Sequence, residues 1–226
     1  MKKCFKCFVG VGVMAALMLA GCNGGPVEVK ERVLVKEDEG ITLNITIPEV
    51  EGLDEFNQQA VKLGEDLEAA ARESQEIYLA ESPNANNSVL SEGDMDFQVK
   101  FVDEQSVSVL NEIFFYAAGG AHGVTLKEPL NYDLGTGSVI ELANLFDGDN
   151  YAAELSELAS LEIENSDFKK WVNDSSMEIS EDQQYYLTPD NVVLVYDQNE
   201  IAAGVAGPIE ILIEKSDLKS LKDLYK

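Results

Sequence analysis

Histidine is the side chain best suited to proton transfer or metal ligation near neutral pH, and the chain contains a single one, His122. It stands in the glycine-rich segment YAAGGAHG, residues 116–123, at the end of a hydrophobic run. Hydrolysis would require a serine or cysteine nucleophile near this imidazole, and the sequence has no G-x-S-x-G elbow. We therefore predict no catalytic residue. His122 is expected to be a turn residue whose ring hydrogen-bonds locally, with a ligand contact as the alternative.

The other residues that could bind a metal do not have the required spacing. Zinc sites draw several ligands from His and Cys, and His122 is alone in this respect. The loop DGDN, residues 147–150, offers oxygen ligands but lacks the Gly and Glu at the positions that an EF-hand requires. Paired carboxylates could flank a glycosidic bond, but 42 acidic residues satisfy any pairing rule by chance. The sequence predicts no metal, no cofactor and no enzymatic activity.

The first 21 residues have the composition of a secretory signal peptide. Basic residues precede an apolar stretch from Phe8 to Ala20, which is shorter than the roughly 20 residues of a transmembrane helix, the alternative reading. Leu19–Cys22, the sequence LAGC, is similar to the bacterial lipobox, in which cleavage before the cysteine frees a diacylglycerated N-terminus. We predict cleavage between Gly21 and Cys22 and lipid attachment at Cys22. Residues 22–26 then form the anchor and tether.

The remaining cysteines support this interpretation. Cys4 and Cys7 lie in the leader, and their C-x-x-C spacing lacks the folded context of a redox or zinc motif. With Cys22 acylated, the mature chain has no thiol. No disulfide framework is expected.

Net charge excludes one class of partner. The chain has 42 acidic and 16 basic residues, a net charge of -26, and loss of three lysines with the leader would change this to -29. A field of that sign repels phosphate backbones, so nucleic-acid binding is not expected, and it attracts cationic proteins. The alternative is that the acidity only keeps the protein soluble.

The first part of the mature chain, residues 27–93, predicts two strands and a helix. Apolar residues alternate over 27–35 and again over 41–47, where Pro48 is expected to stop the strand. From Asp54 onward, apolar residues recur at helical spacing and predict an amphipathic helix packed on that sheet. These positions are Phe56, Ala60, Leu63, Leu67, Ala70 or Ala71, and Ile77. The polar, turn-rich segment 81–94 marks a boundary between two sublobes.

The second part, residues 94–226, predicts several strands and one helix. Strands are expected at 97–101, 107–116 and 124–134, and Gly119, Gly120 and Gly123 permit positive φ in the turn between the last two. The helix follows NLFDGDN and presents Tyr151, Leu155 and Leu158 on one face. A hairpin around Pro189–Asn191 and a last strand with Ile209, Ile211 and Ile213 complete the chain. The fold class is α+β, with mostly antiparallel sheets, a few packed helices and two sublobes.

The order of these segments resembles a known family. The residues that carry the resemblance are Gly119–Gly123, Tyr132–Leu134 with Thr136 and Gly137, Leu145–Phe146, and Tyr196–Gly207. They look like the domain of unknown function in the ectodomain of the lysozyme-sensing anti-sigma-V factor and in the front part of certain peptidoglycan deacetylases. The segment 41–59 is similar to the smaller domain that usually precedes it.

This resemblance implies an extracytoplasmic, ligand-binding fold. The anti-sigma factors also need a cytoplasmic segment and a transmembrane helix, and the deacetylases a catalytic domain with metal-binding histidines, neither of which this sequence offers. We therefore expect a lipid-anchored envelope protein that binds a cationic protein such as lysozyme, or cell-wall glycan. A structural or assembly lipoprotein without such a ligand is the alternative.

Overall fold

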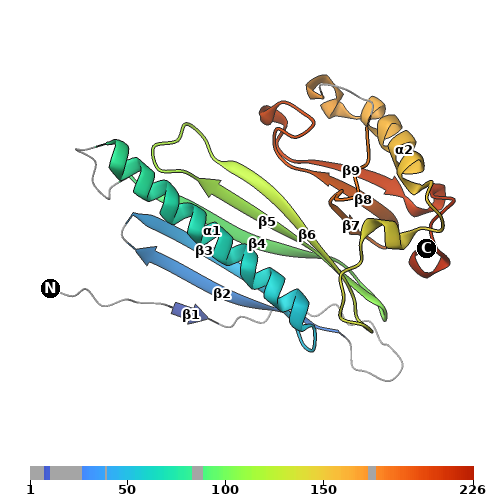
Figure 1. Ribbon diagram of the computed structural model, residues 1–226, viewed down its shortest axis with the longest axis horizontal. Helices are drawn as coiled ribbons and strands as arrows, with labels where there is room; N and C mark the ends of the chain where they lie inside the picture. The colour runs from blue at the N-terminus through green and yellow to red at the C-terminus, as the bar shows by residue number, and fades with distance from the viewer. Residues whose placement is uncertain (1–7, 11–26, 39, 83–88, 173–176) are drawn as a thin grey trace. The chain divides into compact units, whose positions relative to one another are not determined.

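The computed structural model describes residues 8–10, 27–38, 40–82, 89–172 and 177–226 (Figure 1). Contacts divide the chain into two units. Unit 1 comprises Met1–Phe97 and Asn111–Val124, and unit 2 comprises Gln98–Leu110 and Thr125–Lys226. This division differs from the single boundary at residues 93/94 that the sequence suggested, because three strands contribute residues to both units.

A six-stranded sheet has the order β1-β2-β3-β4-β5-β6. Its strands are β1 (Phe8–Gly10), β2 (Val29–Asp38), β3 (Ile41–Val50), β4 (Ser91–Val102), β5 (Ser106–Tyr116) and β6 (Val124–Asp133). The pairs β1·β2 and β2·β3 are antiparallel, whereas β3 and β4 are parallel. A parallel pair needs a crossover, which helix α1 (Asp54–Glu81) supplies. The predicted α+β class with mostly antiparallel strands is confirmed.

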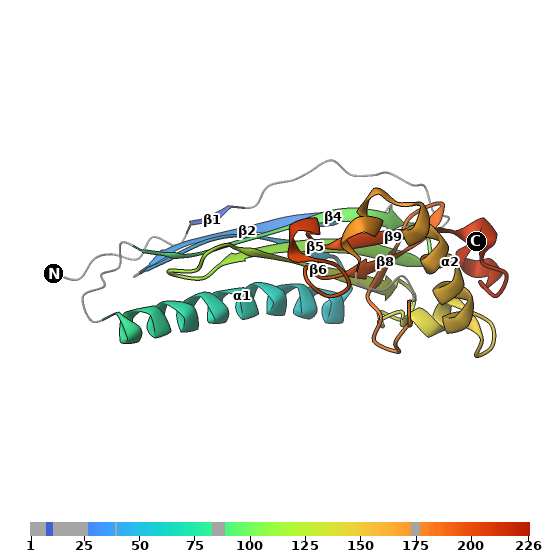
Figure 2. The ribbon, with the colours of Figure 1, turned by 90° about the horizontal axis from the view of Figure 1, so that it is seen from above.

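Helix α1 runs along one face of the sheet in unit 1 (Figure 2). Its buried positions include the predicted Phe56 and Leu67, and they face the alternating buried residues of β3. The expected stripe departs from the structure at its end. Ile77 is 51% exposed, and the polar Gln75 is buried in its place. The Gln75 Nε2 donates to the Val89 carbonyl at 3.2 Å, which offsets part of the cost of burying that amide.

Two further differences concern the strands of unit 1. Pro48 does not end its strand, since β3 continues to Val50. The parallel pairing with β4 covers Ile41–Ile45, so Pro48 lies beyond that ladder, where a missing N–H is tolerated. The end of the predicted turn-rich segment 81–94 also differs, because β4 already begins at Ser91.

Strand β1 lies inside the predicted leader. Its three residues pair with Val33–Val35 of β2. If the leader is cleaved as the sequence predicts, the mature chain lacks β1, and β2 becomes the edge strand of the sheet.

Unit 2 contains an antiparallel three-stranded sheet of order β7-β8-β9. The strands are β7 (Tyr185–Leu187), β8 (Asn191–Tyr196) and β9 (Ile209–Glu214), and the helix is α2 (Tyr151–Asn165). Short 3₁₀ turns lie at Leu142–Leu145, Asp167–Trp171, Gly204–Ala206, Lys215–Asp217 and Asp223–Tyr225. Helix α2 buries Leu155, Ala159 and Ile163 in one core with Ile209, Ile211 and Ile213 of β9. The hairpin, the helix and the last strand agree with the sequence, although the helix face is centred on Ala159 rather than Leu158.

A buried polar network connects β5, β6 and β7 within unit 2. The Ser108 hydroxyl donates to Asn131 Oδ1 at 2.6 Å, and Asn131 Nδ2 donates to the Tyr185 carbonyl at 2.7 Å. The Leu187 N–H donates to Ser108 Oγ at 2.9 Å. Because Ser108 and Asn131 are buried, these bonds satisfy groups that would otherwise lack partners.

Candidate functional site

The glycine-rich turn in unit 1 is the region that the sequence singles out. Of its three glycines, Gly119 alone has a positive φ, 73°. Gly123 is required for a different reason, because a Cβ there would overlap the Phe114 ring. A Cβ at Gly120 would lie 3.0 Å from the Ala117 carbonyl oxygen. The sequence permits a left-handed backbone at all three glycines, but only Gly119 adopts it. At Gly120 and Gly123, neighbouring atoms lie too close to leave room for a side chain.

Hydrogen bonds fix this turn to its surroundings in unit 1. The Ala118 N–H lies 3.1 Å from Ser74 Oγ and 3.2 Å from Ser91 Oγ, and the Tyr116 hydroxyl donates to the Gly120 carbonyl at 2.5 Å. These bonds come from α1, β4 and β5. They hold the turn in one conformation.

His122 is exposed in this turn and has a local contact. Its Nδ1 lies 3.3 Å from the carbonyl oxygen of Gly123. In the ranges that the structure describes, no group of three or more His, Cys, Asp and Glu side chains is gathered as a metal site would require. The turn role and the ligand contact of His122 both stay predictions.

Gly21 and Cys22, the predicted cleavage and lipid-attachment residues, lie outside the described residues. Within the described residues, no helix has the length and hydropathy needed to cross a bilayer.

A groove of about 920 Å³ lies in unit 2, at the β7–β8 turn and the segment that follows β9. Its lining residues are Pro189, Asp190, Asn191, Glu214, Lys215, Ser216, Leu218, Lys219 and Lys226. Three of these are lysines and two are acids. Cationic side chains therefore gather here in a strongly acidic chain.

Lys215 is the unusual member of the groove. It is only 7% exposed, and its Nζ lies 4.8 Å from the centroid of the Phe101 ring, a cation–π distance. Burial lowers the pKa of Lys215, while the charges of Asp103 and Asp190 act in the opposite direction. Neither carboxylate forms an ion pair with it among the described residues.

The backbone around Lys215 is firmly held. Its N–H donates to the Asp190 carbonyl at 2.9 Å, which joins the end of β9 to the β7–β8 turn. That turn is closed by the Thr188 N–H, which donates to the Asn191 carbonyl, and by the Asn191 N–H, which donates to Thr188 Oγ1, each at 2.9 Å. The lysine therefore projects from a fixed frame.

Glu154 of α2 holds the segment that carries Lys219. Its carboxylate accepts the Lys219 N–H at 2.7 Å and the Ser220 N–H at 3.2 Å, together with the Ser220 hydroxyl. Burial alone would raise the pKa of Glu154, but these hydrogen bonds outweigh it and lower the pKa. The carboxylate thus remains ionised and ties this segment to the helix.

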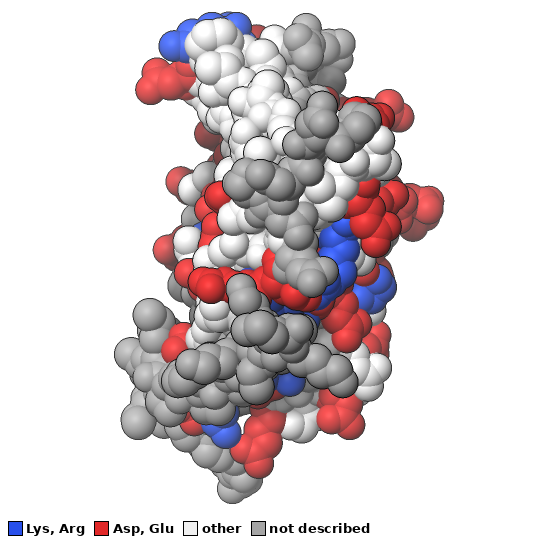
Figure 3. All heavy atoms as spheres, turned by 90° about the vertical axis from the view of Figure 1, so that its left-hand side faces the viewer, with Lys and Arg blue, Asp and Glu red and all other residues white. Residues whose placement is uncertain are grey.

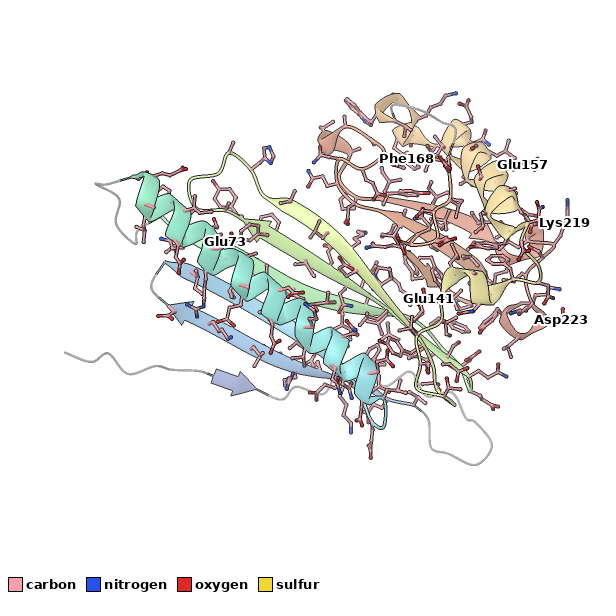
Figure 4. All side chains as sticks on the ribbon, viewed as in Figure 1. Glu73, Glu141, Glu157, Phe168, Lys219 and Asp223 are labelled. Atoms are coloured by element: carbon pink, nitrogen blue, oxygen red, sulfur yellow. The ribbon has the colours of Figure 1, made fainter. Side chains whose placement is uncertain are left out.

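Two exposed lysines complete the basic side of the groove. Lys219 lies on the segment after β9, and Lys226 donates to Asp223 Oδ1 at 2.7 Å (Figure 4). Elsewhere the surface is acidic. On the face in Figure 3, Asp and Glu side chains are spread widely and outnumber Lys and Arg.

A second charged cluster in unit 2 is internally paired. The Glu210 carboxylate accepts the Tyr186 hydroxyl at 2.8 Å and pairs with Lys127, while Lys100 Nζ lies 4.8 Å from the Tyr186 ring centroid. Burial, together with the neighbouring Glu210, raises the pKa of Tyr186. Because each charge has a partner here, we assign this cluster to the structure of unit 2 and not to ligand binding.

Sequence reasoning missed the groove. A usable signal is present in the last residues, where Lys215, Lys219, Lys222 and Lys226 recur at three- and four-residue steps in a chain dominated by Asp and Glu. The burial of Lys215 could not be predicted from the local sequence, because this burial depends on Phe101, more than a hundred positions earlier in the chain.

The family model for DUF3298, described as a protein of unknown function, matches residues 143–216. Most of the residues that line the groove lie in this matched segment. The chain is also 29% identical, over 142 residues, to the peptidoglycan-N-acetylmuramic acid deacetylase PdaC of Bacillus subtilis (strain 168). The match covers 60% of this chain and 30% of the enzyme, so the chain spans less than a third of that relative.

Two solved structures share the fold. A DUF3298 family member from Bacteroides fragilis NCTC 9343 has a TM-score of 0.65 and 19% identity, and covers 87% of this chain and 94% of its own. A DUF3298 protein from Pseudomonas aeruginosa PAO1 has a TM-score of 0.58 and 19% identity, and covers 88% and 94%. The predicted resemblance to the domain of unknown function in peptidoglycan deacetylases is confirmed.

Proposed function

We propose that this chain is a non-catalytic binding domain of the bacterial cell envelope, anchored through a lipid on Cys22, whose ligand is a component of the cell wall. The observation that carries the proposal is the likeness to a peptidoglycan deacetylase, since it relates most of this chain to a protein that works on the cell wall. Because the match covers only 30% of that enzyme, we assign this chain a binding role and not the activity of the whole enzyme.

The groove in unit 2 supports binding over catalysis. Its lining combines lysines with carboxylates and apolar residues, which are groups that hold a polar ligand. It includes no imidazole to act as a general base, since His122 belongs to unit 1.

Co-sedimentation with insoluble peptidoglycan tests the proposal. The full chain should appear in the pellet with purified sacculi and remain in the supernatant with cellulose, an insoluble glycan of neutral sugars. Analysis of the sacculi for freed acetate provides a second readout. Sedimentation equal to that with cellulose would overturn the binding role, and release of acetate would overturn the non-catalytic one.

Lipid anchoring is tested at Cys22. We expect Cys22→Ala to abolish labelling with a radioactive fatty acid and to release the protein from the membrane fraction. Cys4→Ala and Cys7→Ala, which change the leader alone, should leave both properties intact. A Cys22→Ala chain that still carries label and stays with membranes would contradict the anchor.

Net charge favours a second candidate ligand, a cationic envelope protein such as lysozyme. The chain carries -26 charges, and its sequence resembles a lysozyme-sensing ectodomain. A structural or assembly role without a ligand of either kind would account for the fold but not for the basic groove.

A further inference from the structure

The outer edge of strand β2 in unit 1 can accept a further strand. All ten residues of β2, Val29–Asp38, pair with β3 on one side. On the other side, β1 pairs with Val33–Val35 alone (Figure 1). Since β1 lies inside the predicted leader, removal of the leader would leave the outward N–H and C=O groups of β2 without strand partners.

The three residues that β1 covers form an apolar centre in an otherwise charged strand. Val33–Val35 are partly buried, and charged residues precede and follow them in β2. In the pairing with β1, Phe8 lies opposite Val35, and Val9 lies opposite Leu34. Cross-strand pairs of aromatic and β-branched residues stabilise a sheet, so this centre favours a strand with apolar side chains.

The charged residues next to the apolar centre are already paired within unit 1. Arg32 Nε lies 3.3 Å from Glu49 Oε1, and Lys36 forms an ion pair with Glu68 of α1. An incoming strand therefore does not need to supply charges of its own. A short uncharged segment fits this edge.

The strand at the other end of the sheet, β6, is protected by side chains. The Thr125 N–H donates to Gln198 Oε1 at 3.2 Å, and the Lys127 N–H donates to Asp197 Oδ1 at 3.0 Å. Covering an edge in this way prevents it from pairing with another chain. In the part of the chain that the structure describes, no side chain bonds to the backbone of Val33–Val35 in the same manner. Of these two edges, β2 is the one suited to strand addition.

Charge argues against a second copy of the chain as the added strand. Two copies of β2 would pair antiparallel about a two-fold axis, with one residue opposite itself. The registers that align most of β2 are centred on Val33 or Leu34. The first places Lys30 opposite Lys36, and the second places Arg32 opposite Lys36. Like charges directly opposite each other are destabilising, so an uncharged segment of a different protein fits better.

We propose that the outer edge of β2 in the mature chain binds a partner protein, which adds an extended, uncharged apolar segment antiparallel to Val33–Val35. In the unprocessed chain β1 occupies this edge, and cleavage of the leader opens it. The inference rests on the proposed function in one respect, since processing at Cys22 removes β1. Main-chain hydrogen bonds give such a contact its affinity, and side chains at alternate positions give it specificity.

A peptide with the sequence of β1 is the probe. It spans Lys6–Gly12, carries Cys7→Ser and is labelled with a fluorophore. The matched control is the same peptide N-methylated at Phe8 and Val9, so that neither amide can donate to β2. The processed lipoprotein in nanodiscs should bind the probe in a saturable manner and the control about tenfold more weakly. Equal binding of the two peptides would overturn the proposal, because it would not depend on strand pairing.

The unprocessed chain tests whether β1 occupies the edge. Cell-free synthesis without membranes yields the full chain with its leader, which should bind the probe about tenfold more weakly than the processed protein, because β1 competes within the same molecule. Adding Val9→Asp places a charge opposite Leu34 and should restore binding. If the full chain binds as tightly without Val9→Asp as with it, β1 does not occupy the edge.

Substitutions in the apolar centre locate the contact on β2. Val35→Asp, opposite Phe8 of the probe, should weaken binding about tenfold or more, because a charge would be buried against an aromatic ring. Val33→Thr keeps the β-branched shape, should weaken binding about two- to threefold, and keeps the test open if Val35→Asp does not fold. Leu212→Asp, at an exposed position of the outer strand β9, should leave binding unchanged. Unchanged affinity in both β2 variants would overturn the site.

Two further outcomes separate this inference from its alternatives. If the processed protein is a dimer in sedimentation and the probe dissociates it, a second copy occupies the edge and the partner proposed here is wrong. If the full chain with Val9→Asp binds the probe but the leader proves uncleaved in cells, the lipid anchor fails while the strand-binding edge stands.

Discussion

Gly123 shows that a turn can require glycine without a left-handed backbone. Its Cα lies so close to the Phe114 ring that a methyl group would overlap it, and the Phe115 carbonyl oxygen lies 3.0 Å from the same position. The neighbouring His122 has one exposed contact to a carbonyl. Packing therefore adds to the hydrogen bonds that hold the turn, and we expect the exposed imidazole to contribute little to it.

Substitutions in the turn should therefore follow packing. We expect Gly123→Ala to lower the free energy of unfolding by about 1–3 kcal/mol, because the new methyl displaces the Phe114 ring. His122→Ala should cost about 0.5 kcal/mol or less, as is usual for an exposed side chain. Chemical denaturation of both variants measures the difference. A larger effect of His122→Ala would mean that the imidazole holds the turn.

Glu128 on β6 provides a pH-dependent test. Burial raises the pKa of Glu128, the negative charge of Asp197 adds to this, and a hydrogen bond from Gln184 partly opposes it. A raised pKa means that the folded state binds the proton more tightly than the unfolded state, whose value is near 4.5. The ionised carboxylate therefore destabilises the fold above its folded pKa, and this cost disappears as the pH falls to 4.5 and below.

Removing that charge should stabilise the protein in a pH-dependent way. We expect Glu128→Gln to raise the Tm at pH 7 and to have almost no effect at pH 4, where both forms are neutral. Glu157→Gln, which removes an exposed charge on α2, serves as the control for net charge (Figure 4). A gain at pH 7 no larger than that of Glu157→Gln would show that Glu128 is not destabilised by its surroundings.

At the scale of the elements, the network of Ser108 and Asn131 holds β5, β6 and β7 together. Each of its three bonds satisfies a buried donor or acceptor. We expect Asn131→Ala to lower the free energy of unfolding by about 1–3 kcal/mol, because the Tyr185 carbonyl and the Ser108 hydroxyl lose their partner. Asn165→Ala at the exposed end of α2 should change it by less than about 0.5 kcal/mol. If urea denaturation shows the same loss of stability for both variants, the network does not stabilise the fold as we expect.

The elements themselves were largely predictable, because each depends on a local pattern. Alternation marked β3, β4 and β9, and three- and four-residue spacing marked α1. The predictions that were wrong concerned residues whose environment is set by neighbours distant in sequence. Gln75 replaced Ile77 in the core because the Val89 carbonyl lies within reach of its amide. Pro48 stayed in β3 because the parallel pairing with β4 covers only Ile41–Ile45. The basic groove was missed for the same reason.

At the scale of the whole molecule, net charge distinguishes the two candidate ligands by their response to salt. A field from -26 charges attracts cationic proteins at long range. A protein attracted in this way loses association rate as salt rises, whereas a cell-wall glycan held by uncharged contacts should lose much less affinity.

Lysozyme binding can be separated from general electrostatic attraction by the same reasoning. We expect calorimetry to show binding of lysozyme that weakens but persists between 0.1 M and 1 M salt, over which the Debye length falls from about 10 Å to about 3 Å. A specific interface buries roughly 800 Å² on each partner around apolar or aromatic contacts, and that part of the affinity does not depend on screening. Cytochrome c is the basic control and should bind weakly, and only at low salt. If the two proteins bind equally and both are released at 1 M salt, the acidity is a solubilising surface, and a cationic protein is not the ligand.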